Sequence, residues 1–144
     1  MPEGEGTLLY LDSSALVKLV LPEAESEALR EHIRTRPERV ASVIAGVEVV
    51  RAARRASEDP AVEQRAHEVV AGVHLITLSE SLLTAATTAS PRSLRVLDAL
   101  HLETARLLGQ DLEGMVVYDN ALADAARAAG IRVFAPGCGR DAGD

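Results

Sequence analysis

The chain has 144 residues, of which 47% are hydrophobic, and this is enough for a single domain whose core needs no disulfides. A formal net charge of −7 argues against sequence-independent binding of nucleic acid, and an aromatic content of 2% leaves few rings for base stacking. We expect a cytoplasmic protein without membrane contact, because no apolar stretch spans a bilayer, the acidic amino terminus is unlike a secretory signal, and Cys138 has no partner cysteine.

Short apolar runs rich in Val, Ile and Leu alternate with longer helical patterns, as is typical of βαβ units. The predicted strands are Thr7 to Leu11, Arg39 to Ala41, Val73 to Thr77, Met115 to Tyr118 and Ile131 to Phe134. The predicted helices are Ser14 to Val20, Glu23 to Thr35, Val43 to Ser57, Ala61 to Ala71, Ser79 to Ala89, Pro91 to Leu108 and Ala121 to Ala129. The fold class is therefore α/β, with one domain over residues 1–144, a core over about 7–136 and a flexible tail at 137–144.

Local signals set several of these boundaries. Ser90 followed by Pro91 predicts an N-cap and the first position of a helix. Gly109 and Gly130 stand where helices are expected to end in a left-handed turn. The segment "SEDP" at residues 57–60 separates two helices that would otherwise merge.

Asp12 and Asp119 are each the first charged residue after a predicted buried strand. In a parallel α/β sheet the carboxyl ends of the strands open onto the crevice where ligands bind. Aspartate is also a common N-cap, so capping and ligand chemistry both stay open for each residue alone. Two such aspartates favour a shared site, because their carboxylates converge if the strands are neighbours.

Glu48 and Asp98 lie on predicted helices in apolar surroundings. Glu48 interrupts "VIAGVEVV", and an ion pair with Arg51 three residues on is its simplest structural explanation. Asp98 shares a helical stripe with leucines, where a carboxylate is costly unless it is paired or metal-bound. A hydrogen bond to His101, one turn on, is the structural alternative for Asp98, and His101 itself is expected to be a core histidine.

Several carboxylates can remain ionised side by side only if a counter-ion is present. Two unit charges about 4 Å apart repel by on the order of 4 kcal/mol at an effective dielectric of 20. Oxygen ligands without a cysteine or histidine cluster favour Mg²⁺ or Mn²⁺ over zinc. Such an ion would also let an acidic protein act on nucleic acid, since it reverses the sign of the site locally.

Four segments together resemble the successive motifs of PIN-domain ribonucleases, most closely the VapC toxins of bacterial toxin–antitoxin pairs. They are "YLDSSALVKL", "SVIAGVEVVRAARR", "LRVLDALHLETA" and "VVYDNALADAARAAGIRV", and they span residues 7 to about 136 in the order of the family. The resemblance implies five parallel strands in the order 3-2-1-4-5 and an acidic site holding Mg²⁺ or Mn²⁺. The residues at its acidic positions, which would be both catalytic and metal-binding, are Asp12, Glu48, Asp98 and Asp119, with Ser14 as the supporting hydroxyl.

The last motif departs from the family at two positions. Val117 replaces a frequent threonine, and Asn120 replaces a basic residue. Asn120 is therefore a candidate neutral oxygen for metal or water, and Asp124 is a candidate outer carboxylate or a surface acid. For the phosphates of the substrate, the candidates are Arg51, Arg54 and Arg55 on the helix of Glu48, with Lys18, Arg92 and Arg95 as further cations.

The function that the resemblance implies is metal-dependent endonucleolytic cleavage of RNA by the toxin of a toxin–antitoxin pair. The implied partners are an RNA substrate, a VapB-type antitoxin whose basic segment enters the acidic site, and a second copy in a homodimer. A receiver domain is disfavoured because no lysine follows the last strand, and a haloacid-dehalogenase-type phosphatase because Ser14 stands where it needs an aspartate. The remaining alternative is a PIN-like binding scaffold without catalysis.

Overall fold

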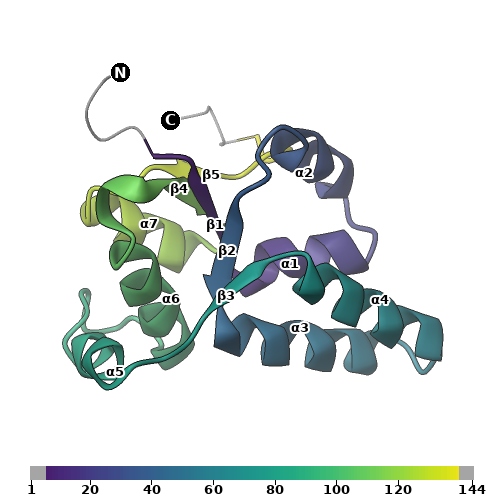
Figure 1. Cartoon of the computed structure of the whole chain (residues 1–144), viewed down its shortest axis with the longest axis horizontal. Helices are drawn as coiled ribbons and strands as arrows, with labels where there is room; N and C mark the ends of the chain where they lie inside the picture. The colour runs from purple at the N-terminus through teal and green to yellow at the C-terminus, as the bar shows by residue number, and fades with distance from the viewer. Residues whose placement is uncertain (1–5, 140–144) are drawn as a thin grey trace.

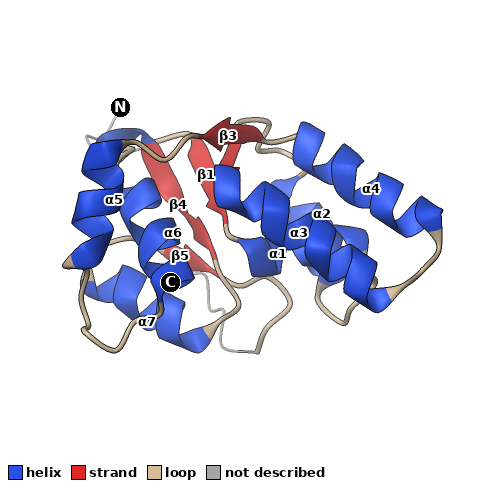
Figure 2. Cartoon of the chain, turned by 90° about the horizontal axis from the view of Figure 1, so that it is seen from below, coloured by secondary structure: helices blue, strands red, loops and turns tan. Residues whose placement is uncertain are grey.

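The computed structural model describes residues 6–139, which form a sheet with helices on both of its faces (Figures 1 and 2). The strands are β1 (Leu8–Leu11), β2 (Arg39–Ser42), β3 (His74–Ile76), β4 (Leu112–Val116) and β5 (Val133–Phe134). The helices are α1 (Ser13–Val20), α2 (Ser26–Ile33), α3 (Val43–Ala56), α4 (Pro60–Ala71), α5 (Glu80–Thr87), α6 (Val96–Arg106) and α7 (Asn120–Ala128), with a 3-10 turn at Gly109–Asp111. Residues 140–144 of the tail that we predict to be flexible lie outside the described residues.

The five strands are parallel in the order β3-β2-β1-β4-β5, which confirms the expected α/β class and strand order. Each connection between parallel strands crosses over the sheet through at least one helix. The order places β1 between β2 and β4, so the carboxyl ends of β1 and β4 are adjacent. That edge is where Asp12 and Asp119 follow their strands.

Alternate residues of β1 pack into two different cores. Leu9 and Leu11 join the core formed with α1, α2, α3 and α4, whereas Tyr10 joins the core formed with α6 and α7. In both views α1 to α4 lie on one side of the sheet and α5 to α7 on the other (Figures 1 and 2). β1 is therefore buried on both faces, which explains its unbroken apolar sequence.

The predicted helix from Pro91 to Leu108 is wrong at its start, because α6 begins only at Val96, after Arg95. The preceding residues form a turn in which the Leu94 amide donates to the Pro91 carbonyl at 2.9 Å. Proline at this position thus begins a turn and not the helix. The correction places Asp98 in the first turn of α6, where the helix dipole favours a carboxylate.

Most other predicted boundaries agree with the structure to within two residues. α2 begins three residues later than predicted, and β4 begins three residues earlier because Leu112 pairs with Leu8 of β1. Gly109 and Gly130 have positive φ values of 54° and 84°, which confirms them as turn positions after helices. No helix within residues 6–139 combines the length and the apolar character that crossing a bilayer requires.

Candidate functional site

Asp12 follows β1 and is almost fully buried, with 4% of its surface exposed. One of its oxygens, Oδ1, accepts hydrogen bonds from the Ala15 amide at 3.0 Å and the Ser14 hydroxyl at 2.7 Å. Asp12 is therefore the N-cap of α1, and Ser14 orients its carboxylate. Burial raises the pKa of Asp12 to about 6, although His101, Ser14 and the Ala15 amide act in the opposite direction.

Asp119 lies at the corresponding point after β4 and is the N-cap of α7. Its Oδ2 accepts a hydrogen bond from the Leu122 amide at 2.9 Å. The two strand ends are joined directly, since the Tyr118 amide donates to the Ser14 hydroxyl at 3.4 Å. Both aspartates thus cap helices, and both also face the edge where β1 and β4 end side by side.

Glu48 lies on α3 and is partly buried. Its Oε1 is 3.0 Å from His101 Nε2, and the Ser13 hydroxyl donates to the same oxygen. Partial burial favours the neutral acid, but the hydrogen bonds from His101 and Ser13 outweigh it and hold the pKa of Glu48 below its usual range. The side-chain partner of Glu48 is therefore His101 and not Arg51.

Asp98 lies in the first turn of α6 and is partly buried. Burial, the neighbouring Asp119 and Glu48 raise its pKa, while His101 and Arg95 act in the opposite direction. The charge of Asp98 in turn contributes to the raised pKa of Asp12. Asp98 therefore interacts electrostatically with each of the other three acids: Asp119 and Glu48 raise its pKa, and it raises the pKa of Asp12.

His101 is 2% exposed and connects this group to the core. Its Nδ1 lies 2.7 Å from the Tyr10 hydroxyl, and its Nε2 lies 3.1 Å from the Ser13 hydroxyl as well as near Glu48. The expected core position of His101 is confirmed, but its partners are Tyr10, Ser13 and Glu48, where we considered Asp98. No role was predicted for Tyr10 or Ser13, and the only signal in the sequence is that they lie within two residues of Asp12.

The donors fit a hard divalent cation in chemistry, since they are carboxylate oxygens with raised pKa values at Asp12 and Asp98. Within residues 6–139, no three side chains of His, Cys, Asp or Glu are close enough together to hold a metal directly. Mg²⁺ is commonly held by one or two carboxylates and several waters. A hard divalent cation at this edge would therefore have to be held by one or two of these carboxylates together with water.

Most of the remaining predicted site residues are exposed, whereas Lys18 is largely buried and paired with Glu23 and Glu25. Arg51 and Arg54 are exposed on α3, and Arg54 Nη1 is paired with Glu63 Oε1 at 2.8 Å. Asn120 is exposed at the start of α7. Asp124 is 81% exposed in its side chain and lies 3.6 Å from Arg127, so it is a surface acid.

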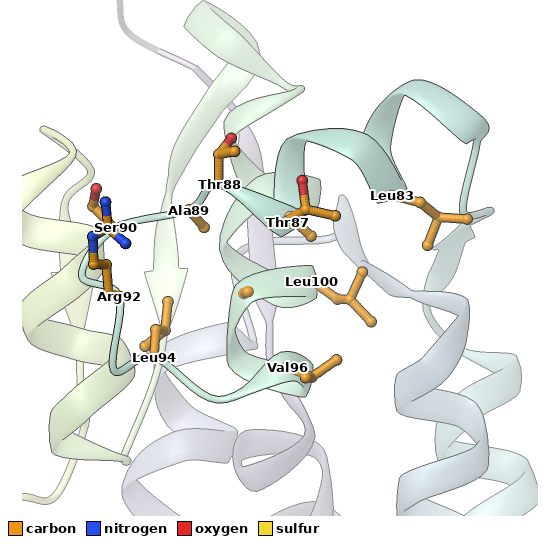
Figure 3. A pocket seen from close by; sticks show the side chains of 11 residues that line it. Leu83, Thr87, Thr88, Ala89, Ser90, Arg92, Leu94, Val96 and Leu100 are labelled. Atoms are coloured by element: carbon orange, nitrogen blue, oxygen red, sulfur yellow. The ribbon is translucent and has the colours of Figure 1, made fainter.

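A cavity of about 780 Å³ lies between α5, α6 and the segment that joins them (Figure 3). Leu83, Val96 and Leu100 line one side, and Ser90 and Arg92 of the joining segment lie on the other. None of the four carboxylates lines this cavity. It is therefore separate from the acidic group, although α6 contributes to both.

A family model described as PIN domain matches residues 9–128. Ribonuclease VapC46 of Mycobacterium tuberculosis is 42% identical over 128 residues, which cover 89% of this chain and 97% of that protein. Ribonuclease VapC35 of the same organism is 37% identical over 139 residues, which cover 92% of this chain and 100% of that protein.

Two solved structures share the fold at low sequence identity. The M. tuberculosis toxin VapC20, titled a sarcin-ricin loop cleaving toxin, has a TM-score of 0.67 at 16% identity and covers 85% of this chain and 95% of its own. A toxin–antitoxin complex from Klebsiella pneumoniae has a TM-score of 0.61 at 20% identity and covers 77% of this chain and 86% of its own. Motifs, strand order and relatives agree, and the chain belongs to the PIN-domain family, in its VapC branch.

Proposed function

We propose that this chain is the toxin of a toxin–antitoxin pair and acts as a metal-dependent endoribonuclease. The observation that supports the proposal is that Asp98 interacts electrostatically with Asp12, Glu48 and Asp119, in a chain whose curated relatives are named ribonucleases. The proposed catalytic and metal-binding residues are Asp12, Glu48, Asp98 and Asp119. Mg²⁺ is the proposed ion and Mn²⁺ the substitute, because the donors are all carboxylate oxygens.

A bound divalent cation supplies charge neutralisation at the scissile phosphate and lowers the pKa of an attacking water. The chain supplies the fixed carboxylates. Asp12 and Asp119 are immobilised as helix caps, with Ser14 holding Asp12 at 2.7 Å. Glu48 is held by Ser13 and His101, so its carboxylate keeps one orientation while substrate binds.

The proposed phosphate contacts are Arg51, Arg54 and Arg95. Arg51 is exposed on the helix that carries Glu48, and Arg95 precedes α6 near enough to act on the charge of Asp98. Arg54 must first leave Glu63. Asn120, next to Asp119, is a proposed neutral ligand of water or metal, because an amide oxygen accepts from water without adding charge.

The proposed protein partners are a VapB-type antitoxin and a second copy of the chain. A net charge of −7 favours a partner with a basic segment, since complementary charge speeds association. We propose that the antitoxin binds a groove formed in part by the first helices, α1 and α2, as the resemblance implies. A homodimer and a cytoplasmic location stay predictions.

The proposal is tested by incubating the purified chain with defined RNAs in Mg²⁺, in Mn²⁺ and in chelator, beside Asp98→Asn. We expect cleavage by the wild-type chain that chelator and Asp98→Asn both abolish. Equal cleavage by wild type and variant would assign the activity to a contaminant. RNA binding without cleavage under every condition would favour a PIN-like scaffold.

A further inference from the structure

Four buried or partly buried side chains form one chain of hydrogen bonds behind the acidic site. The Tyr10 hydroxyl lies 2.7 Å from His101 Nδ1, and His101 Nε2 lies 3.0 Å from Glu48 Oε1. The Ser13 hydroxyl lies 3.1 Å from the same Nε2 and donates to Glu48. Tyr10 is fully buried in β1, so the end of the network that lies farthest from Glu48 is fixed by the core.

The partners decide where the proton of His101 lies. An ionised carboxylate only accepts hydrogen bonds, so Nε2 must carry the hydrogen that points to Glu48. In the neutral form of imidazole, Nδ1 is then the acceptor, and the Tyr10 hydroxyl is the donor in their contact. The tyrosine and histidine rings meet nearly edge to face, at 76° with centroids 5.9 Å apart, which restricts rotation of the imidazole.

Both described contacts to Glu48 fall on the same oxygen, Oε1. This arrangement orients the carboxyl plane and directs Oε2 away from His101. His101 also lies one turn after Asp98 on α6, so its contacts with β1 and α3 fix the helix that carries Asp98. The network therefore connects three of the elements that hold the acids.

We infer that His101 is a positioning residue, held by Tyr10, which orients Glu48 for a divalent cation at the acidic site. The inference rests on the proposed function for the location of that cation. It assigns no contact with RNA to His101, which is 2% exposed. Hydrogen-bond partners of metal-binding groups act in this way in other proteins, and their loss lowers metal affinity or activity by about 10- to 100-fold.

The inference is tested by titrating the full chain with Mn²⁺ in a calorimeter and measuring RNA cleavage on the same samples. His101→Leu removes the contacts with Tyr10, Ser13 and Glu48 at similar volume, and we expect Mn²⁺ affinity to fall by about 10- to 100-fold. His101→Gln keeps an amide donor, so its loss is smaller and rising Mn²⁺ concentration restores kcat. The matched control is His67→Gln on α4, whose imidazole lies 3.5 Å from Glu63, and we expect it to leave Mn²⁺ affinity unchanged.

Tyr10→Phe deletes only the hydroxyl that contacts His101 Nδ1, so any effect on Mn²⁺ binding must act through His101. We therefore expect it to weaken Mn²⁺ binding in the wild-type background and to add nothing in the His101→Leu background. If His101→Leu does not fold, His101→Gln provides both the single variant and the background for Tyr10→Phe.

Folded His101 variants that bind Mn²⁺ as tightly as wild type overturn the inference, as does a wild type that binds no Mn²⁺. Fully additive losses for Tyr10 and His101 overturn the role of Tyr10. A wild type that binds Mn²⁺ without cleaving any RNA overturns the proposed function alone, because the affinity series still measures positioning.

Discussion

Glu48 on α3 and His101 on α6 are 53 residues apart in sequence, and their side chains meet with 3.0 Å between Oε1 and Nε2. The contact crosses the carboxyl edge of the sheet, and α3 and α6 lie on opposite faces. It links the two cores at the point where the acids gather. Because an ionised carboxylate that loses a buried donor keeps its desolvation penalty, removal of His101 alone should destabilise the site.

Asp12→Asn is expected to stabilise the metal-free chain at neutral pH. Burial raises the pKa of Asp12 from 3.8 to about 6. Protonation of Asp12 therefore stabilises the folded chain fully below pH 3.8, and this stabilisation is lost as the pH rises through about 6. At pH 7.5 the wild type therefore carries a penalty on the order of 3 kcal/mol that a neutral asparagine lacks. Asparagine still accepts from the Ala15 amide, so the cap remains.

The measurement is thermal unfolding of wild type and Asp12→Asn in chelator at pH 5 and pH 7.5. The melting temperature of the variant should exceed that of wild type at pH 7.5, with a smaller gap at pH 5. Added Mg²⁺ should raise the wild-type value and leave the variant nearly unchanged. A variant that is less stable at both pH values would contradict the assigned burial penalty.

Asp98→Asn is expected to lower kcat for RNA cleavage by at least about 100-fold, the upper end of losses seen around metal sites. The side chain keeps its size and its place in the first turn of α6, so the melting temperature should not fall. Asp124→Asn is the matched control, because Asp124 is a surface acid paired with Arg127. Loss of activity in both variants would point to a general charge effect.

Arg51→Gln is expected to weaken RNA binding more than Arg54→Gln, because Glu63 already pairs with Arg54 at 2.8 Å. Binding is measured on the Asp98→Asn background over a range of salt concentrations. A phosphate contact on single-stranded RNA contributes about 0.7 to the slope of log affinity against log salt. An unchanged slope for Arg51→Gln would remove it from the phosphate contacts.

Two glycine substitutions are expected to change stability in opposite directions. A Cβ at Gly114 would lie 2.6 Å from the Phe134 ring and 2.8 Å from the Arg132 carbonyl, so Gly114→Ala should destabilise the fold by about 1–3 kcal/mol. At Gly46, within α3, the nearest atom is Val70 Cγ1 at 3.5 Å. Gly46→Ala should therefore stabilise the chain by up to about 1 kcal/mol, which urea unfolding of both variants would measure.

The sequence predicted the alternation of strands and helices because the signals for it are local. Apolar runs, caps such as Asp12, and the turn glycine at Gly130 act over a few residues, and the structure agrees with them. The start of α6 was misplaced because Ser90 and Pro91 fit both an N-cap and a turn. Only contacts of the surrounding chain distinguish these two conformations.

The sequence alone also determined which residues are the candidates for the chemistry, since four acids in apolar contexts stand out in any fold. Tertiary structure decided their partners. Glu48 contacts His101 and not Arg51, and His101 contacts Tyr10, which is 91 residues away in the sequence. Packing of α3 and α6 against β1 fixes these contacts, and no local pattern encodes a distance between residues so far apart in the chain.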